Sequence, residues 1–359
     1  MSGKSIRVDL EQPYDVVVGE NVLANAVDST RHANGVVVVC DEHVEAFHGA
    51  RLAGLERAPR VKLPRGEAAK AFAVLQRTLE HFAELGLERN SMVVALGGGA
   101  TCDLAGLAAS LYMRGLAVVY CPTTLLAQVD ASVGGKTAIN LAAGKNLVGT
   151  FHQPRAVYAD TATLATLDAA EFRSGLGETL KTALIAGPAL FERIEASVDA
   201  LLARDRDLLS ETVASCVRVK ARFVVDDERE QGPRKVLNLG HTFAHAIEHV
   251  AGYGRIPHGV AVATGIVLAI ETARECGVLR DEALHERVVH LLARLALPAS
   301  LAELRLASNC ALPAHALLAA MRLDKKARAA EPRLVLPRAI GAFELDVRVD
   351  AALLSERLR

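Results

Sequence analysis

The stretch Val93–Ser110, "VVALGGGATCDLAGLAAS", joins a short apolar run to an alanine-rich run through three consecutive glycines. The first run is typical of a buried β-strand and the second of a helix. A glycine turn between a strand and a helix lets backbone N–H groups and the positive end of the helix approach a pyrophosphate closely. The turn does not match GxGxxG, and a tight turn that needs positive φ is the alternative explanation. The stretch therefore predicts a strand–turn–helix unit, with phosphate binding as a hypothesis.

Four more short runs in the first half of the chain are typical of β-strands, namely "YDVVVG", "GVVVVCDE", "RVKLP" and "AVVYCPTT". Helical patterns separate them, which favours a parallel α/β sheet. From about Glu171 long helical periods prevail, and "PRLVLPRAIGAFELDVRVD" near the end indicates two short strands joined at a turn. We therefore predict an α/β domain over residues 1–170 and a helical domain over residues 171–359.

The 359 residues include 41 Lys plus Arg and 42 Asp plus Glu, a formal net charge of −1. This balance offers no basic surface to nucleic acid or to an anionic membrane, so we expect a small-molecule partner. The six cysteines form no CxxC pair, which favours free thiols in a reducing compartment. The longest apolar run, "GVAVATGIVLAI", is shorter than the roughly 18 residues of a membrane helix, and the N-terminus lacks the apolar stretch of a signal peptide. We expect a soluble, cytoplasmic protein.

Polar residues follow or neighbour the predicted strands. Asp41 ends one strand, where an acid commonly holds a nucleotide ribose, although a strand-terminal turn acid is the simpler alternative. "GEAAK" adds Glu67 and Lys70, and "CPTT" places Thr123 and Thr124 at the end of another strand. Ligands gather at the carboxyl ends of parallel strands, so these residues together predict a nicotinamide or similar dinucleotide.

A helical segment, "NLGHTFAHAIEHV", places His241, His245 and His249 four residues apart on one helix face, and His258 follows a turn rich in Gly and Pro. Such histidines can simply flank a polar groove. A catalytic zinc commonly takes two histidines and a carboxylate and keeps one position open. The carboxylate that we nominate is Glu178 in "SGLGETLK", although the spacing alone does not join it to the histidines.

Lys181 lies one helical turn beyond Glu178 and shares its face. An acid and a lysine at this spacing usually form a solvent-exposed pair. The remainder of the segment is strongly apolar, "TALIA", so we expect this pair to point into a cleft.

Lysines are scarce: only ten of the 41 basic residues are lysine, and two of them lie in "DASVGGKTAINLAAGKNLVGTFHQP", Asp130–Pro154. Several motifs occur in the order found in a known family. They are this stretch, "YMRG", "SGLGETLK", "LNLGHT" with "HAIE", and "HG" with "AVA". Over nearly its whole length the chain resembles the 3-dehydroquinate synthases, within the sugar phosphate cyclases. The resemblance implies an α/β N-terminal Rossmann-like domain that binds NAD and a mainly α-helical C-terminal domain that binds a divalent metal, with the active site between them.

The resemblance also implies roles for individual residues. The metal ligands would be Glu178, His241 and His258. NAD would be held by Asp41, Glu67, Lys70, Gly98, Gly99, Asp103, Thr123 and Thr124, with Lys136 and Lys145 at the margin of nucleotide and substrate. The substrate pocket would contain Asp130, Lys136, Asn146, Lys181, Lys220, Arg234, Asn238, His245 and Lys326, the last in preference to Lys325. Arg114 is expected to reach the phosphate of the substrate in the neighbouring subunit of a homodimer.

By the same resemblance, the substrate would be 3-deoxy-D-arabino-heptulosonate 7-phosphate and the products 3-dehydroquinate and phosphate. The reaction would proceed by transient oxidation with NAD, elimination of phosphate, reduction and intramolecular aldol closure. His245 would either relay protons or support the metal ligands. A substrate with a phosphate and a carboxylate explains why so many of the scarce lysines fall in these motifs, since lysine is a compact point charge.

Three departures from the family's usual pattern and several alternatives remain, and the first departure is "GGGATCD" in place of the more usual "GGGVIGD" at the glycine turn. Val260 stands where the family commonly has an acid after His-Gly, so the outer support of His258 is in question, and the segment after Lys326 lacks a usual glycine. The metal could be zinc or cobalt. The alternatives are another sugar phosphate cyclase of the amino-dehydroquinate or valiolone type, a metal-dependent polyol dehydrogenase, and a non-catalytic binding protein on the same scaffold.

Overall fold

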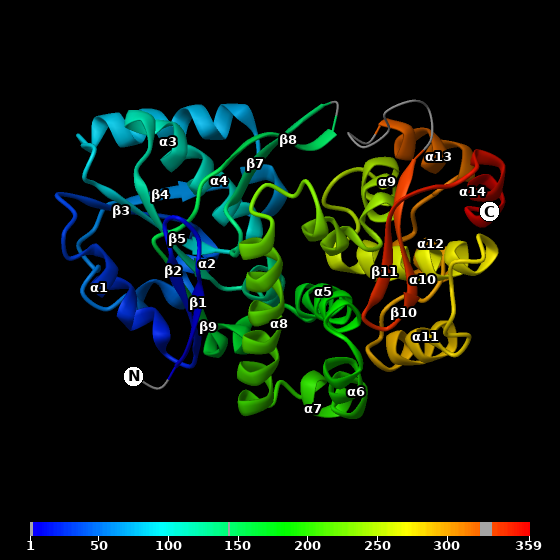
Figure 1. Ribbon diagram of the computed structural model, residues 1–359. Helices are drawn as coiled ribbons and strands as arrows, with labels where there is room; N and C mark the ends of the chain where they lie inside the picture. The colour runs from blue at the N-terminus through cyan, green and yellow to red at the C-terminus, as the bar shows by residue number, and fades with distance from the viewer. Residues whose placement is uncertain (1–2, 143, 324–331) are drawn as a thin grey trace. The chain divides into compact units, whose positions relative to one another are not determined.

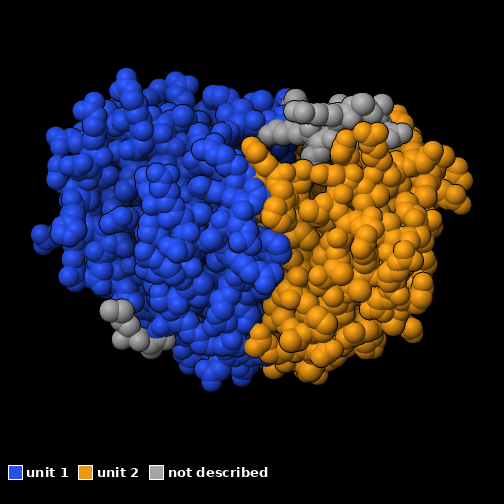
Figure 2. Space-filling model, viewed as in Figure 1, with its two compact units in different colours: residues 1–172, 204–229 blue, residues 173–203, 230–359 orange. Residues whose placement is uncertain are grey.

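The computed structural model describes residues 3–142, 144–323 and 332–359. The chain divides into two compact units, which Figure 2 shows in different colours. The first consists of Met1–Phe172 and Arg204–Arg229, and the second of Arg173–Ala203 and Glu230–Arg359. Within the described ranges, no helix has both the length and the apolar character that crossing a membrane requires.

A seven-stranded sheet forms the centre of the first unit (Figure 1). Its strands, in spatial order, are β1 (Lys4–Val8), β2 (Tyr14–Gly19), β9 (Ala156–Asp160), β6 (Ala117–Pro122), β5 (Met92–Gly97), β3 (Val36–Asp41) and β4 (Arg60–Leu63). All neighbours are parallel except β1 and β2, which are antiparallel. Every residue of β5 is buried, as expected for a central strand covered on both faces. The predicted parallel α/β sheet is confirmed, and the five quoted runs correspond to β2 through β6.

Helices and one hairpin surround this sheet. They are α1 (Ala26–Thr30), α2 (Glu42–His48), α3 (Phe72–Glu84), α4 (Gly99–Leu111) and the hairpin of β7 (Lys136–Leu141) with β8 (Gly144–Phe151). Helix α4 follows the glycine turn directly and packs against β5, β6 and β7. The strand–turn–helix unit predicted from Val93–Ser110 is therefore present, with its turn at the carboxyl end of β5.

The first unit also includes α8 (Arg206–Asp226), although the sequence analysis placed all of residues 171–359 in one helical domain. This helix contacts β1 and β2 and buries one face that includes Leu209, Val213 and Val217. A helical hydrophobic period shows that a face is buried but not which element covers it. The predicted division therefore differs from the compact units at residues 204–229.

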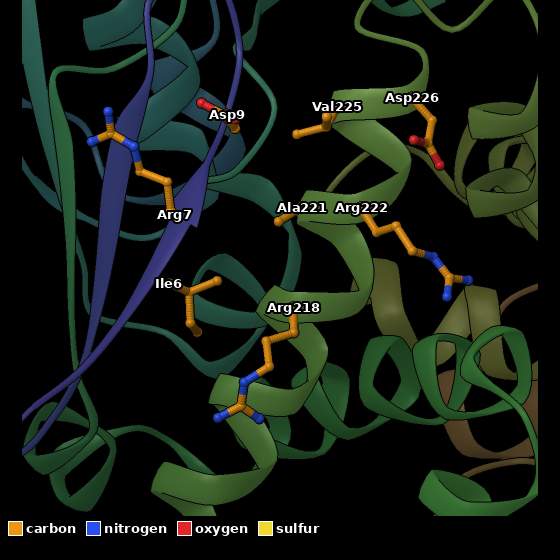
Figure 3. Close-up of a pocket in the computed structure, with 8 residues that line it drawn as sticks. All are labelled: Ile6, Arg7, Asp9, Arg218, Ala221, Arg222, Val225 and Asp226. Atoms are coloured by element: carbon orange, nitrogen blue, oxygen red, sulfur yellow. The ribbon is translucent and has the colours of Figure 1, made fainter.

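A pocket lies between β1 and α8 (Figure 3). Ile6 and Arg7 line it from the strand, and Arg218 and Arg222 belong to the helix. None of the predicted site residues lines this pocket. Two of its arginines have acidic partners within the unit, since Arg7 Nη1 lies 3.2 Å from a carboxylate oxygen of Asp15 and Arg218 Nη1 lies 3.5 Å from one of Glu211.

In its described residues, the second unit is helical apart from one two-stranded ribbon, as the sequence predicts. Its elements are α5 (Ala169–Ala186, of which the first four residues belong to the first unit), α6 (Pro188–Ala196), α7 (Val198–Leu202), α9 (His241–Ala251), α10 (His258–Glu275), α11 (Leu284–Arg294), α12 (Leu301–Ser308), α13 (Ala314–Leu323), β10 (Arg333–Ala339), β11 (Ala342–Arg348) and α14 (Ala351–Arg357). Most residues of α10 are buried, and α9, α11, α14 and β10 pack against it. Figure 1 shows the two strands of this ribbon crossing α10.

The imidazole of His48, at the end of α2, is buried in the first unit, and its Nε2 lies 2.9 Å from the Thr166 hydroxyl. Desolvation, followed by the nearby Arg51 guanidinium, lowers the pKa of His48 from 6.5 to about 4. Between these values the unfolded chain binds more protons than the folded one, so the free energy of unfolding falls as pH decreases through this window. Two pH units below neutrality, at pH 5, the loss should be about 2 kcal/mol relative to pH 7.

Urea unfolding of the His48→Gln variant at pH 7 and pH 5 tests this prediction, because glutamine keeps a polar group but does not titrate. We expect the variant to lose less stability over this interval than the unmodified chain. The exposed histidine His32, replaced in the same way, serves as the control. An identical pH dependence for His48→Gln and the unmodified chain would contradict the prediction.

Candidate functional site

Three side chains from three helices of the second unit meet in one cluster. Glu178 lies in α5, His241 is the first residue of α9 and His258 is the first residue of α10. The Glu178 Oε1 atom is 3.7 Å from His241 Nε2 and 3.4 Å from His258 Nε2. One ligand atom from each residue lies within 4.8 Å of the other two, which makes this set a possible metal centre.

Two glycines bring α5 and α10 into close contact beside this cluster. A Cβ atom on Gly259 would lie 1.8 Å from the Ser174 carbonyl oxygen, and one on Gly177 would lie 2.1 Å from the Gly259 carbonyl oxygen. The Gly259 N–H donates to Ser174 Oγ at 3.0 Å, which fixes the same crossing. Because Glu178 follows Gly177 and His258 precedes Gly259, this contact holds the carboxylate and the imidazole together.

A second close contact positions His241. Gly240 precedes it with a φ of +76°, a left-handed conformation that favours glycine, and a Cβ atom on Gly265 of α10 would lie 2.3 Å from the Gly240 carbonyl oxygen. The start of α9 therefore rests directly on the backbone of α10. All three residues of the cluster are thus adjacent to a glycine that permits close helix packing.

The Glu178 carboxylate is fully buried, and the ammonium group of Lys181, which is 1% exposed, lies 2.5 Å from its Oε2 atom. The pair is buried and not exposed to solvent, as its apolar surroundings indicated, and the expected cleft stays a prediction. The two oxygens have separate partners: Oε2 faces the lysine, and Oε1 faces both imidazoles. A buried carboxylate costs several kcal/mol unless cations or donors compensate it. The burial of this acid among nitrogen ligands therefore indicates a specific role.

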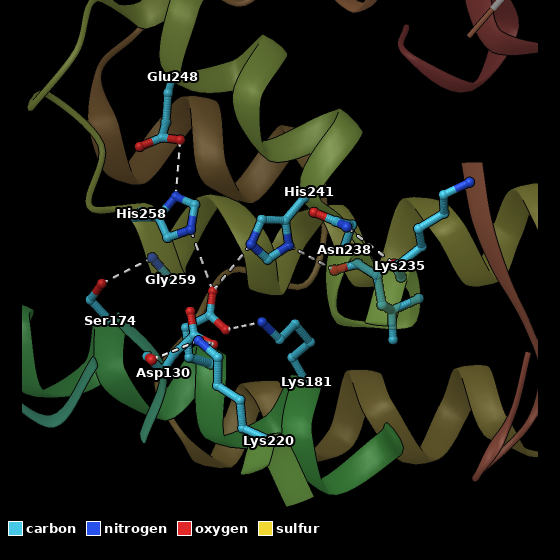
Figure 4. Close-up of polar contacts among 12 residues, drawn as sticks. Asp130, Ser174, Lys181, Lys220, Lys235, Asn238, His241, Glu248, His258 and Gly259 are labelled. Atoms are coloured by element: carbon cyan, nitrogen blue, oxygen red, sulfur yellow. Dashed lines mark hydrogen bonds and ion pairs between the residues drawn. The ribbon is translucent and has the colours of Figure 1, made fainter. Parts of the chain in front are cut away.

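The donor set fits a catalytic zinc or a similar ion. Two histidines and one carboxylate are a recurrent set for an ion that keeps one position open, with bonds of about 2.1 Å. Two such ligands on a tetrahedral ion are about 3.4 Å apart, close to the 3.4 and 3.7 Å between Glu178 Oε1 and the two histidine nitrogens. The opposite nitrogens are occupied, since His241 Nδ1 lies 3.2 Å from the Leu239 carbonyl and His258 Nδ1 lies 3.0 Å from Glu248 Oε2 (Figure 4).

The other histidines of α9 separate into two environments. The His245 ring lies 5.5 Å from the His241 ring and 6.1 Å from the His258 ring, measured between centroids. It is next to the cluster but not part of the ligand set. His249, which the spacing placed on the same face, instead lies with its Nδ1 3.2 Å from the Tyr253 hydroxyl.

Two polar residues predicted for substrate belong to the short helix η7 (Pro233–Asn238) in the second unit. Arg234 is one of the largest fully buried side chains. The Asn238 amide donates to Glu230 Oε1 at 2.7 Å. Arg234 is therefore enclosed by the protein, and the Asn238 amide is held by a hydrogen bond. Lys326 and Lys325 lie outside the described residues.

The glycine turn of the first unit is not a turn that needs positive φ, which was the alternative explanation for its three glycines. None of Gly97, Gly98 and Gly99 has positive φ. Glycine is required at the turn because a larger residue would collide with its neighbours. A Cβ on Gly97 would lie 2.5 Å from the Thr101 hydroxyl oxygen, and one on Gly98 would lie 3.0 Å from Thr124 Cγ2. No described side chain caps the start of α4, so its backbone N–H groups can receive a phosphate.

Beside this turn the first unit contains a partly buried network of charges. Lys70 Nζ lies 2.5 Å from Asp103 Oδ2 and also contacts Asn146 Oδ1, and Lys145 Nζ lies 2.9 Å from Glu67 Oε1. Burial raises the pKa of Asp103 despite Lys70. Burial opposes ionisation of Glu67 as well, but the ammonium groups of Lys145 and Lys70 hold its pKa below the usual range. Five predicted residues therefore occupy one polar cluster.

Asn140 joins this network, although the sequence analysis did not select it. Its amide donates to Glu67 Oε2 at 2.7 Å, and its carbonyl oxygen accepts from the Asn146 N–H at 3.0 Å. Asn146 has a φ of +56°. Asn140 therefore links the end of β7 to the start of β8, the strand that carries Lys145 and Asn146.

Asp130 lies in a π-helical turn, η5 (Ala127–Ala131), and pairs with Lys220 of α8. Lys220 Nζ donates to the Asp130 carbonyl oxygen and to its Oδ1 atom, both at 2.6 Å. Gln128, fully buried in the same turn, donates to the carbonyl oxygens of Pro122 and Asp160 at 3.0 and 2.9 Å. A single π turn often marks a functional site, and here it orients Asp130.

The remaining predicted residues of the first unit have varied surroundings. Asp41 ends β3 and accepts the Val44 N–H at 2.8 Å as the N-cap of α2. It therefore lies at the end of a strand, as predicted, and it also has the structural role of a turn acid that the sequence left open as the alternative. Thr123 and Thr124 follow β6, and Thr123 N–H donates to the Gly97 carbonyl at 2.9 Å. Lys136 and Arg114 are exposed, and Arg114 has a φ of +69°.

Comparison with known proteins decides the family. Models of the 3-dehydroquinate synthase N-terminal and C-terminal domains match residues 60–174 and 175–327. A 3-dehydroquinate synthase from Paracoccus denitrificans is 43% identical over 100% of this chain and 99% of its own length. One from Caulobacter vibrioides is 43% identical over 96% of this chain and 95% of its own. The chain belongs to the 3-dehydroquinate synthase family. It is a phosphorus–oxygen lyase, and the other sugar phosphate cyclases are not favoured.

Solved structures agree with this assignment. A 2-deoxy-scyllo-inosose synthase complexed with carbaglucose-6-phosphate, NAD+ and Co2+ has a TM-score of 0.86 at 26% identity, covering 100% of this chain and 99% of that one. A 2-epi-5-epi-valiolone synthase from Streptomyces hygroscopicus with NAD+ and Zn2+ bound has a TM-score of 0.84 at 30% identity, covering 96% and 95%. A glycerol dehydrogenase from Schizosaccharomyces pombe, at 17% identity, a TM-score of 0.67 and coverage of 96% and 87%, shares the fold.

Proposed function

We propose that this chain converts 3-deoxy-D-arabino-heptulosonate 7-phosphate to 3-dehydroquinate and phosphate with the residues described above. The observation that carries the proposal is the buried cluster of Glu178, His241 and His258 in a chain of this family. A protein that only binds a ligand has no need of an acid buried among nitrogen ligands. The cluster therefore supports the lyase over a non-catalytic binding protein.

We infer that these three residues hold one divalent ion, zinc or cobalt. When bound, the ion would supply Lewis acidity that lowers the pKa of a substrate hydroxyl. Lys181 compensates the second oxygen of Glu178, so that the carboxylate keeps its orientation. His245, beside the two ligand histidines, would accept and return a hydroxyl proton at its imidazole nitrogen.

The glycine turn and the network beside it would hold NAD. The cofactor would supply transient acceptance and return of a hydride. The uncapped N–H groups at the start of α4 would bind its pyrophosphate, with Gly98 and Gly99 leaving room for it. Asp41 ends β3, and Thr123 and Thr124 follow β6 at the same edge of the sheet. Four residues of the polar network would border the nucleotide, namely Glu67, Lys70, Asp103 and Lys145.

The cations and amides of the substrate set would bind the phosphate and the carboxylate of the substrate. Their members are Lys136, Asn146, Lys181, Lys220, Arg234, Asn238 and, outside the described residues, Lys326. Lysine and arginine suit these anions for different reasons, because lysine is a point charge and arginine a planar fork. Asp130 would orient Lys220, to which it is paired at 2.6 Å.

We further infer a homodimer in which the exposed Arg114 reaches the substrate phosphate of the partner subunit. The cytoplasm is the proposed compartment. Its reducing conditions suit six cysteines that are all free thiols in the structure.

Replacing Lys220 by methionine should lower turnover far more than stability. The variant keeps the aliphatic stem, but Asp130 loses a charged donor, and loss of one such donor at an active site typically costs about 10²- to 10³-fold in kcat. The expected loss of stability is about 1–3 kcal/mol. Initial rates of phosphate release and urea unfolding measure the two effects.

The control for this variant is Lys62→Met. Lys62 belongs to the same unit and lies 3.7 Å from Glu42 and 3.6 Å from Glu45 on the surface. It should retain the rate of the unmodified chain. An unchanged rate in Lys220→Met would remove Lys220 from the proposed site.

The proposed reaction is tested by supplying 3-deoxy-D-arabino-heptulosonate 7-phosphate with catalytic NAD and either zinc or cobalt, while phosphate and NADH absorbance are followed. We expect phosphate release without net NADH, and 3-dehydroquinate as the product by NMR. Accumulation of NADH would indicate a dehydrogenase instead. Phosphate release only from a neutral sugar phosphate would indicate another cyclase activity.

A further inference from the structure

A second acid is buried next to the cluster, on α9. Glu248 is 2% exposed, and its Oε2 atom lies 3.0 Å from His258 Nδ1 (Figure 4). His258 Nε2 is the nitrogen that faces Glu178 Oε1, at 3.4 Å. The imidazole therefore lies between two carboxylates, one on each nitrogen.

We propose that Glu248 is a positioning residue that fixes the tautomer and orientation of His258 for metal binding. This inference rests on the proposed metal centre. An ionised carboxylate can only accept, so with Glu248 ionised Nδ1 carries the hydrogen and the lone pair of Nε2 is directed toward the side of Glu178. A carboxylate on the far nitrogen also makes the imidazole a stronger donor to a metal.

The burial of Glu248 supports a specific role. An ionised carboxylate in the protein interior costs several kcal/mol unless it is paired. An aliphatic residue at this position of α9 could pack against α10 without that cost. An acid in this place is therefore explained better by what it does for His258 than by the stability of the helix contact.

The two ligand histidines are supported differently. His241 Nδ1 lies 3.2 Å from a neutral backbone carbonyl, that of Leu239, whereas His258 Nδ1 meets a carboxylate. The residue that follows His258 and Gly259 is Val260, which offers no acid. Glu248 thus answers the question that Val260 raised about the support of His258, because it reaches the imidazole from a different helix.

The sequence itself indicates that Glu248 lies on the same side of α9 as two of the histidines. Glu248 follows His241 by seven residues and His245 by three, which places all three on one face of a helix. A merely structural role, in which Glu248 pins α9 to α10, predicts an effect on unfolding. A positioning role predicts an effect on the metal itself.

The test is a cobalt(II) titration of metal-free protein, followed by absorption spectroscopy with a competing chelator. We expect Glu248→Gln to bind cobalt about 10- to 100-fold more weakly than the unmodified chain, with an altered visible spectrum. The matched control is Glu271→Gln, which removes another carboxylate from a histidine of the same unit, His285, at 3.2 Å. The control should bind cobalt within about twofold of the unmodified chain, since this pair does not touch the cluster.

Urea unfolding of the metal-free proteins separates an effect on cobalt binding from a general loss of stability. The positioning role predicts weaker cobalt binding than a loss of metal-free stability can explain. Cobalt binding and a spectrum equal to those of the unmodified chain would overturn this inference alone. A Glu248→Gln variant that loses cobalt only in proportion to lost folding would overturn it as well. Failure of the unmodified chain to bind cobalt would overturn the proposed metal centre together with the inference.

Discussion

Replacing Glu178 by glutamine is expected to reduce phosphate release by a factor on the order of 10³ or more, with loss of tight metal binding. The Oε1 atom of this carboxylate is the one that faces both imidazoles, at 3.7 and 3.4 Å. An amide carries no charge and is a poor ligand for zinc or cobalt. The substitution also leaves the ammonium group of Lys181, 2.5 Å from Oε2, without its carboxylate.

Metal analysis and initial rates check this prediction. The matched control is Glu195→Gln, which breaks another acid–base pair of the same unit, to Arg287 at 2.8 Å, where both side chains are partly exposed. Such a pair contributes about 0–1 kcal/mol, so the control should retain metal and rate. A Glu178→Gln variant with a normal metal content and rate would show that the ion, if any, is held elsewhere.

Substituting Gly259 by alanine should disrupt the centre without touching a ligand. The added Cβ would lie 1.8 Å from the Ser174 carbonyl oxygen, which is backbone and cannot turn aside. Ordinary contact requires about 3.4 Å or more, so α5 and α10 must separate or tilt. We expect a loss of about 3 kcal/mol of stability or more. In the fraction that folds, Glu178 and His258 should no longer reach one ion.

Unfolding in urea and cobalt binding by the folded fraction measure these two effects. Gly49→Ala is the control, because Gly49 has helical φ and ψ of −56° and −41°, and a Cβ there would meet only the flexible side chain of Glu45, at 3.1 Å. Its stability should change by less than about 1 kcal/mol. Normal stability and cobalt affinity in Gly259→Ala would refute the account of the helix crossing.

The sheet of the first unit could be predicted because its strands are short runs of β-branched residues between helical patterns, as in β3 and β5. Three described elements of the sheet region were not predicted. The sequence of β1 (Lys4–Val8), KSIRV, is largely polar, and that of β9 (Ala156–Asp160), AVYAD, contains two alanines and an acid, so neither is a β-branched run. The β7–β8 hairpin is rich in glycine and polar residues. The placement of α8 could not be predicted either, since its apolar period does not identify its partner.

The candidate site was only partly readable from the chain. The spacing of His241 and His245 placed them on one helix face, but it also grouped His249 with them, and the structure gives His249 a different neighbour, Tyr253. Glu178 was nominated because a zinc site commonly includes a carboxylate and because the segment around Glu178 is apolar. Its spacing from the histidines gave no such indication. The glycines at 177 and 259 gave no signal of a helix crossing, because such contacts depend on tertiary packing that no local pattern encodes.

The most direct test of the central claim is to titrate zinc into metal-free protein while phosphate release from 3-deoxy-D-arabino-heptulosonate 7-phosphate is followed with catalytic NAD. The account predicts that the rate rises in proportion to added zinc, reaches its plateau at one ion per chain and proceeds without net NADH. The same titration of His241→Ala should stay near the baseline. A rate that is indifferent to zinc and to chelator, in a protein that still releases phosphate, would contradict the claim that Glu178, His241 and His258 hold a catalytic ion.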